Sequence, residues 1–164
     1  MYGGTLYFVT GGRAIEPLSI DAFPLIVGYS GMKAVTVALI NLVKEKADCY
    51  PEVVEGIFND IEKLVELAKN ALVAKDWSAF GELMNFNQGY LAALGVSTRT
   101  LANMIYAARG AGAYGAKLSG AGGGDCMIAV ASDGKKEAVA NAIAQVGGEV
   151  IPVVTNAQGV RIEQ

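Results

Sequence analysis

The sequence predicts an α+β fold, in which helices pack on one face of an antiparallel sheet. Short β-prone runs separated by Gly, Pro and Asp open and close the 164-residue chain, and apolar residues at helical spacing fill its middle. With 52% hydrophobic and 18% charged residues, the chain has the composition of a globular protein and the length for one hydrophobic core. We therefore expect a single domain over residues 1–164.

The N-terminal part of the chain contains three β-prone runs, at residues 5–10, 14–20 and 23–29. Two glycines separate the first two runs, and a turn-forming segment from Asp21 to Pro24 separates the second from the third. Consecutive strands joined by short turns usually pair with one another. We expect an antiparallel meander.

The middle of the chain predicts four successive helices, because apolar residues recur there every three or four positions. The helical ranges are 33–46, 51–72, 77–94 and 98 to 110 or 112. The second has the clearest periodicity, with Glu and Lys between its apolar positions.

The ends of these helices carry recognisable residues. Pro51 suits the first position of the second helix, and Asp76 and Ser97 are the predicted N-caps of the third and fourth. Gly81 and Gly89 lie inside the third helix, where each costs roughly 1 kcal/mol of helix propensity. Their presence indicates that another segment packs closely there.

The C-terminal part alternates strands with one more helix. An apolar run at 125–130 predicts a strand, and Asp133 is the predicted cap of a helix that ends before Gly147. Two last strands are expected at 149–155 and 159–163.

Composition and charge exclude several classes of function. The net charge is −3 and the basic residues are scattered, so neither nucleic acid nor an anionic membrane is an expected partner. The chain has no histidine and no CxxC pair, which argues against a zinc-type metal site, and both cysteines are expected as reduced thiols. No signal-peptide run and no apolar stretch of membrane-spanning length is present, which predicts a cytoplasmic location.

The most unusual stretch is "AKLSGAGGGDCMIAVA", residues 116–131. A P-loop or a dinucleotide-binding loop requires a helix after its glycines, whereas here a β-like apolar run follows. The loop is therefore expected to join strand to strand. Its bare amides could form a nest for an anion, and a flexible hairpin turn is the alternative.

Within this stretch "KLSGAGGGDC", residues 117–126, resembles the third conserved motif of the GHMP kinases, K-L-[ST]-G-A-G-G-G-G-C. Nine of the ten positions agree, and Asp125 stands where the family prefers Gly. Four more segments resemble this family in the same order, most closely the mevalonate kinases of archaeal type. They are "YGG" at 2–4, "YSGMKAVT" at 29–36, "LMNFNQGYLAALGVS" at 83–97 and "AGAYGAKLSG" at 111–120.

The resemblance implies a ferredoxin-like GHMP kinase C-terminal domain, the second of two lobes. The ATP phosphate loop, the catalytic Asp, a substrate-facing Lys and the Mg²⁺ ligands belong to the first lobe, so we expect ATP and Mg²⁺ to bind mainly there. No catalytic residue and no metal ligand is expected in this chain, which should be inactive alone because phosphoryl transfer depends on positioning and charge neutralisation.

The implied activity is ATP-dependent phosphorylation of mevalonate to mevalonate 5-phosphate, in isoprenoid biosynthesis. Another GHMP kinase, acting on phosphomevalonate, homoserine or a sugar, is one alternative, and a non-catalytic module that binds a small anion is another. The implied partners are mevalonate and the first lobe, and a homodimer is left open.

The resemblance assigns the small residues of the loop to contacts with the substrate and with the ATP phosphate loop. These residues are Ser119, Gly120, Ala121, Gly122, Gly123 and Gly124. Ala121 is expected beside mevalonate. Lys33 and Thr36 are candidates for a substrate or phosphate contact, although their spacing differs from the family's usual Arg, and a plain surface lysine is the alternative for Lys33.

Three other residues need an explanation. The carboxylate of Asp125 would repel phosphates unless it points away or pairs with a cation. Lys117 could supply that cation, and a solvent-facing strand lysine is the alternative. Gln88 stands where the family often has His, so it is limited to hydrogen bonding.

Overall fold

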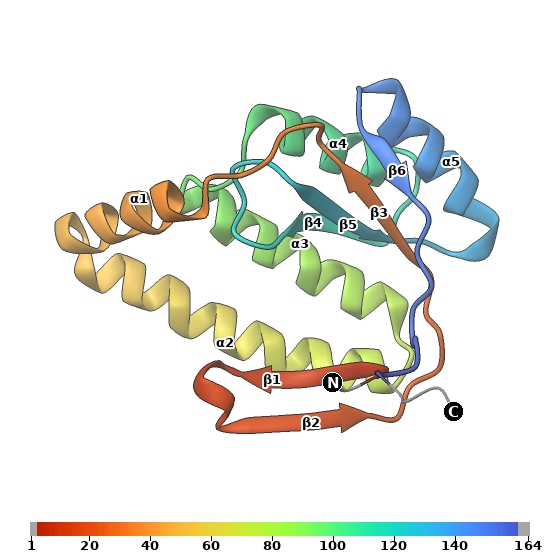
Figure 1. Cartoon of the computed structure of the whole chain (residues 1–164), viewed down its shortest axis with the longest axis horizontal. Coiled ribbons are helices and arrows are strands. Elements are labelled where there is room, and N and C mark those ends of the chain that lie inside the picture. Colours follow the sequence, from red (N-terminus) through yellow and green to blue (C-terminus); the bar gives the residue numbers. More distant parts are fainter. Residues whose placement is uncertain (1–2, 161–164) are drawn as a thin grey trace.

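The structure is a computed structural model that describes residues 3–160. Two antiparallel sheets and five α-helices make up this range (Figure 1). The strands are β1 (Thr5–Val9), β2 (Ala14–Leu18), β3 (Leu25–Tyr29), β4 (Gly115–Ser119), β5 (Cys126–Val130) and β6 (Glu149–Ile151). The helices are α1 (Thr36–Cys49), α2 (Pro51–Val73), α3 (Trp77–Ala93), α4 (Arg99–Gly110) and α5 (Asp133–Gln145), with a 3-10 turn, η1, at Thr10–Gly12.

The larger sheet has four strands in the order β4-β5-β3-β6, and every neighbouring pair is antiparallel. Its strands and the helices α4 and α5 form the ferredoxin-like arrangement, in which helices connect β3 to β4 and β5 to β6, and a loop connects β4 to β5. Both helices lie on one face, over a core of fully buried side chains that includes Leu101, Met104, Met127 and Ile143. The predicted fold class is confirmed.

The smaller sheet is a hairpin of β1 and β2 only. The predicted three-strand meander is therefore wrong, because β3 pairs instead with β5 and β6. Ile26 and Gly28 of β3 are buried in the main core, whereas the hairpin has no fully buried residue. Burial of one face of β3 decides its sheet, and local turn signals carry no information about such a distant partner.

The hairpin is held on the long helix α2 by a group of polar side chains. The Tyr7 hydroxyl donates a hydrogen bond to Glu66, and the Lys69 ammonium lies 4.1 Å from the centre of the Tyr7 ring. Lys69 also lies 3.4 Å from the Glu16 carboxylate. These contacts fix β1 and β2 beside α2, below the main sheet in Figure 1.

Helix α3 runs along the free edge of β4, where the two backbones come very close. A methyl group at Gly81 would lie 2.3 Å from the Tyr114 carbonyl carbon, and one at Gly115 would lie 2.0 Å from the Gly81 carbonyl oxygen. Only glycine permits this approach. Close packing at Gly81 is confirmed, but it is wrong for Gly89, which has open space beside it.

The helix ends confirm some predicted caps and correct others. Asp76 caps α3 by accepting a hydrogen bond from the Ala79 amide. The cap of α4 is Thr98, not Ser97, because the Thr98 hydroxyl accepts from the Leu101 amide. Asp133 is the first residue of α5 instead of its cap, and it forms an ion pair with Lys136.

The C-terminal strands are shorter than predicted. β6 ends at Ile151, immediately before Pro152, which has no amide hydrogen for a sheet. Residues 159 and 160 form no strand, and the rest of the predicted last strand, 161–163, lies outside the described residues, as does Tyr2 of the "YGG" segment. Within the described range no helix is both long enough and apolar enough to cross a membrane.

Candidate functional site

The glycine-rich loop connects β4 to β5, so it joins strand to strand as the sequence predicts. Ser119, the last residue of β4, pairs with Cys126, the first residue of β5. Between them the backbone dihedral φ is positive at Gly120, Gly122, Gly123 and Gly124, with values of 79, 80, 73 and 154°. Side chains rarely adopt this conformation, so the loop requires its glycines for backbone reasons alone.

The inner glycines also make room for neighbouring parts of the protein. A methyl group at Gly122 would lie 2.3 Å from the Val96 carbonyl oxygen, and one at Gly123 would lie 2.6 Å from the Leu39 side chain. At Gly124 it would lie 2.7 Å from a backbone oxygen of the segment before α1. The protein's own segments therefore occupy the space beside these three glycines.

The outer end of the loop is open. A methyl group at Gly120 would meet no atom within 4 Å, and both Gly120 and Ala121 are exposed. Within residues 3–160 their amide hydrogens have no hydrogen-bond acceptor. Ala121 also lines an apolar groove of about 260 Å³ with Val96 and side chains of α1. A ligand would reach an amide edge and an apolar wall at this point.

The start of α1 lies against the same loop. The Asp125 amide donates to the Met32 carbonyl oxygen at 2.6 Å, and the Ser30 amide donates to the Asp125 carbonyl oxygen at 2.8 Å. These bonds bring the segment that carries Lys33 and Thr36 to the loop, and both side chains are exposed. Thr36 is the first residue of α1, whose N-terminus has no side-chain cap and no acidic residue in its first turn. Free amides and the helix dipole make such a terminus favourable for an anion.

Asp125 is fixed by its backbone, with φ at +56°, a conformation that Asp tolerates better than most residues. Its carboxylate forms no ion pair with any residue between 3 and 160. Burial and then the Asp125 charge raise the pKa of the neighbouring Cys126 thiol, which is half-buried at the start of β5. Within residues 3–160 the Asp125 carboxylate therefore has no cationic partner.

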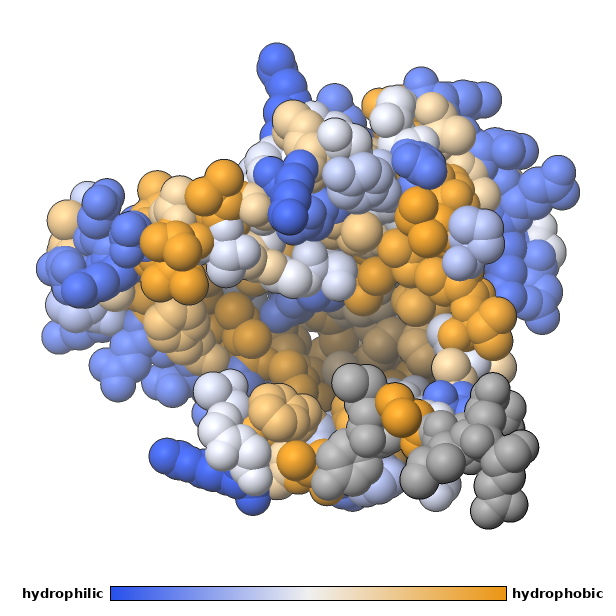
Figure 2. Space-filling model, in the orientation of Figure 1, coloured by the Kyte–Doolittle hydropathy of each residue, from blue (hydrophilic) through white to orange (hydrophobic). Residues whose placement is uncertain are grey.

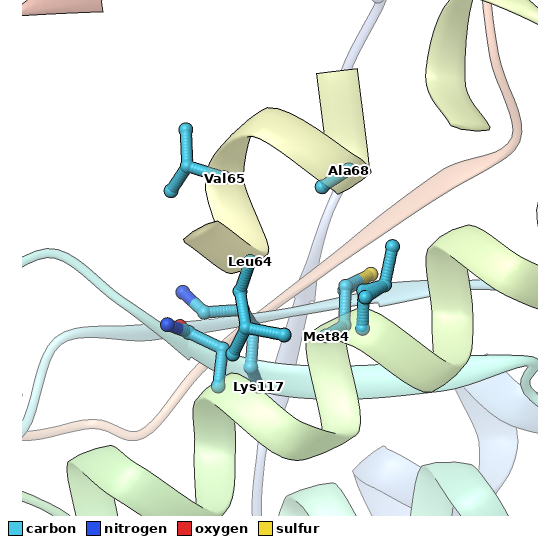
Figure 3. Close-up of a pocket in the computed structure, with 7 residues that line it drawn as sticks. Leu64, Val65, Ala68, Met84 and Lys117 are labelled. Carbon is cyan, nitrogen blue, oxygen red and sulfur yellow. The ribbon is translucent and has the colours of Figure 1, made fainter. Parts of the chain in front are cut away.

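Lys117 differs from both sequence-based alternatives, since it neither pairs with Asp125 nor faces solvent. It lines a pocket of about 160 Å³, and its ammonium donates to the Leu118 carbonyl oxygen at 2.7 Å. Leu64 of α2 and Met84 of α3 line the same pocket, as Figure 3 shows. Burial among these apolar groups lowers the pKa of Lys117, because the charged form loses hydration.

Figure 2 shows a hollow between the β1–β2 hairpin and the rest of the molecule, with largely hydrophobic walls. The half-buried face of the main sheet, opposite α4 and α5, carries Val27 and Ile128 in one cross-strand row with Lys117. No group of three His, Cys, Asp or Glu side chains within residues 3–160 could hold a metal ion.

Side chains from two helices satisfy the free edge of β4 before the chain enters the loop. Asn85 accepts from the Ala116 amide at 3.1 Å, and Gln88 accepts from the Leu118 amide at 2.9 Å. The Arg109 guanidinium donates to the Ala116 carbonyl oxygen at 2.6 Å, and burial lowers its pKa. The hydrogen-bonding role predicted for Gln88 is confirmed, whereas sequence periodicity gave no signal for Asn85 or Arg109.

Comparison with known proteins identifies the family. The sequence profile described as GHMP kinases C terminal matches residues 61–149, more than half of the chain. The chain belongs to the GHMP kinase family. The matched range runs from α2 to the start of β6 and includes the whole glycine-rich loop.

The similar members of this GHMP kinase family include archaeal proteins named mevalonate kinase. The one from Pyrococcus horikoshii is 45% identical over 169 residues, and that from Pyrococcus abyssi is 43% identical over 167. Each alignment covers 99% of this chain and 49% of the relative. The chain thus spans about half the length of the curated relatives it matches.

Solved GHMP kinase structures agree with the fold. The L. major mevalonate kinase in complex with R-mevalonate matches with a TM-score of 0.86 and 25% identity, over 97% of this chain and 51% of that one. The Streptococcus pneumoniae phosphomevalonate kinase matches with a TM-score of 0.73 and 22% identity, over 85% and 42% of the two chains. Because its identity is lower, the second match is evidence for the shared fold and not for a shared function.

Proposed function

We propose that this chain is the C-terminal lobe of a mevalonate kinase, which transfers a phosphoryl group from ATP to mevalonate and forms mevalonate 5-phosphate. The observation that carries the proposal is the 45% identity, over 99% of the chain, to a protein named mevalonate kinase. The geometry is compatible with it, because one end of the glycine-rich loop offers free amides to an anion.

The proposed ligand-facing surface consists of the loop residues Ser119, Gly120, Ala121, Gly122, Gly123 and Gly124. Gly120 and Ala121 would contact ligand directly, since they are exposed and their amides are free. Ala121 would lie beside mevalonate, whose methyl group suits the apolar groove that Ala121 lines. The inner glycines would act indirectly, by letting the loop pack on Val96 and α1.

Phosphate groups of ATP would fit the other side of the loop, where Gly124 and Asp125 contact the segment before α1. The exposed Lys33 ammonium, the Thr36 hydroxyl and the uncapped N-terminus of α1 would supply positive charge and hydrogen-bond donors. Mg²⁺ has no comparable set of ligands within residues 3–160. From the family resemblance we assign the Mg²⁺ ligands, the catalytic Asp and the main ATP cradle to the other lobe, and expect this chain alone to be inactive.

Two alternatives remain. Phosphomevalonate kinase and galactokinase share the fold, so another small-molecule alcohol is one of them, but neither structure exceeds 22% identity to this chain. A non-catalytic anion-binding module is the second. A cytoplasmic location and a homodimer stay predictions.

A chimera tests the proposal. This chain would replace the aligned half of the Pyrococcus horikoshii mevalonate kinase, and ADP release would be measured with mevalonate, phosphomevalonate, homoserine and galactose. We expect mevalonate-dependent release by the chimera and none by the 164-residue chain. Turnover by the chain alone contradicts the two-lobe assignment, and a folded chimera that prefers another alcohol contradicts the assigned substrate.

A further inference from the structure

Gln88 is one of two buried polar residues in the described range, and only 7% of its surface is exposed. Each end of its side-chain amide makes a hydrogen bond to a different segment. The oxygen accepts from the Leu118 amide at 2.9 Å, and the nitrogen donates to the Ser97 hydroxyl at 3.0 Å. A buried amide whose oxygen and nitrogen bond to different segments holds those segments at a fixed separation.

The two bridged segments are the two supports of the glycine-rich loop. Leu118 lies one residue before Ser119, where β4 ends and the loop begins. Ser97 follows Val96, whose carbonyl oxygen accepts a 2.7 Å hydrogen bond from the Gly123 amide. Gln88 therefore connects the entry of the loop to the segment that holds its far side.

We propose that Gln88 is a positioning residue for the glycine-rich loop. It fixes the distance between the end of β4 and the segment from Val96 to Ser97, and so holds the amides of Gly120 and Ala121 toward the ligand. Gln88 itself does not touch the ligand. The effect of this positioning on catalysis rests on the proposed function, whereas its effect on the loop does not.

A second amide on the same helix provides a matched control. Asn85, about one helical turn before Gln88, accepts from the Ala116 amide at 3.1 Å and donates to the Tyr114 carbonyl oxygen at 3.3 Å. It satisfies the same edge of β4 but at the end away from the loop. Loss of Asn85 should therefore reduce stability without loosening the loop selectively.

The test measures amide hydrogen exchange by NMR in the 164-residue chain, with the Gly123 amide as the reporter. Gln88→Met keeps the side-chain length but removes both hydrogen bonds, and we expect exchange at Gly123 to accelerate about tenfold or more beyond the change at core amides of α4. Asn85→Leu should change exchange at Gly123 only as much as at those core amides. Gln88→Glu should keep near-wild-type exchange, because a buried protonated carboxyl group can still accept from Leu118 and donate to Ser97.

Unchanged relative exchange at Gly123 in Gln88→Met, or equal acceleration in Asn85→Leu, overturns the proposal. If Gln88→Met does not fold, Ser97→Ala breaks only the second half of the bridge and should still accelerate exchange at Gly123 selectively; no effect there also overturns it.

In the chimera, Gln88→Met should lower kcat/KM for mevalonate about tenfold. Gln88→Glu should leave kcat/KM near the wild-type value. Wild-type kcat/KM in a Gln88→Met chimera overturns the catalytic part. Absence of mevalonate turnover by the unmutated chimera counts instead against the proposed function, and the exchange result stands independently.

Discussion

Two glycines of the loop allow a paired test of what the small residues do. Gly120 and Gly122 have nearly the same φ, 79 and 80°, but different surroundings. A methyl group meets no atom within 4 Å at Gly120, whereas at Gly122 it lies 2.3 Å from the Val96 carbonyl oxygen and 2.9 Å from the Val96 side chain. Alanine at each position therefore separates the cost of the backbone conformation from the cost of the contact.

The magnitudes follow from these two surroundings. Alanine in the left-handed conformation costs about 1 to 2 kcal/mol, and this applies to both variants. Overpacking adds about 1 to 3 kcal/mol at Gly122 only. Displacement of Val96 also weakens its hydrogen bond to the Gly123 amide, worth about 1 kcal/mol. We expect a loss of about 1 to 2 kcal/mol for Gly120→Ala and about 3 to 6 kcal/mol for Gly122→Ala.

Urea unfolding followed by tryptophan fluorescence measures both values. Trp77 is the one tryptophan of the chain and stacks on Phe23, with ring centres 6.3 Å apart, so its emission reports the packing of α3 against the segment before β3. The entropy that alanine removes from the unfolded chain is similar in the two variants and cancels in their difference. Equal losses of stability would refute the view that Val96 occupies the space beside Gly122.

Three further predictions concern single side chains. Lys117→Met should raise the free energy of unfolding at neutral pH, because the buried charge is removed. The pKa of Lys117 is lower in the folded state than in the unfolded state, so wild-type stability should rise with pH between these two values. Urea unfolding at a series of pH values should show this rise in the wild type and not in the variant. Asp125→Gly should lower the pKa of the Cys126 thiol, which the pH dependence of alkylation measures in a protein whose other cysteine is replaced by Ser. The same substitution should tighten phosphate-ligand binding in the chimera. Unchanged binding would mean that the Asp125 carboxylate points away from the phosphate. Gly81→Ala should destabilise the protein by about 1 to 3 kcal/mol or more, because the added methyl group would lie 2.3 Å from the Tyr114 backbone. Gly89→Ala, in open space on the same helix, should stabilise the protein by up to about 1 kcal/mol. Equal effects of the two substitutions in thermal unfolding would contradict the close contact at Gly81.

The parts of the fold that depend on local patterns could be predicted from the sequence. The apolar run after the glycines is enough to make the loop a strand-to-strand connection, because a helix there would need a different period. The periodicity of α2 and the cap at Asp76 are also local signals, and the structure has both.

Two of the failed predictions share a different cause, which is competition between segments that are separated in the sequence. Ser97 and Thr98 both carry a hydroxyl at the start of α4, and the sequence offers no means of choosing between them. The buried Gln88 uses the Ser97 hydroxyl, which leaves Thr98 to cap the helix. Likewise β5, the partner of β3, is about a hundred positions away along the chain, beyond any local pattern.

Most glycines of the loop are explained by contacts inside the protein. Gly122, Gly123 and Gly124 are all required by contacts inside the protein, so a long run of glycines is not by itself a measure of how much ligand the loop touches. The part available to a ligand is its outer end, at Gly120 and Ala121, whereas the segment that carries Lys33 contacts the loop at Gly124 and Asp125.

Asp125 belongs to the part of the loop that contacts the segment before α1. The position needs a positive φ and two backbone hydrogen bonds to the segment before α1, and Asp supplies both, so it can replace the family's usual Gly without changing the path of the chain. What it adds is one negative charge beside Cys126, at the base of a surface proposed to receive phosphate. Its effect on function should therefore be electrostatic, visible as salt-dependent ligand affinity and absent from the stability of the loop.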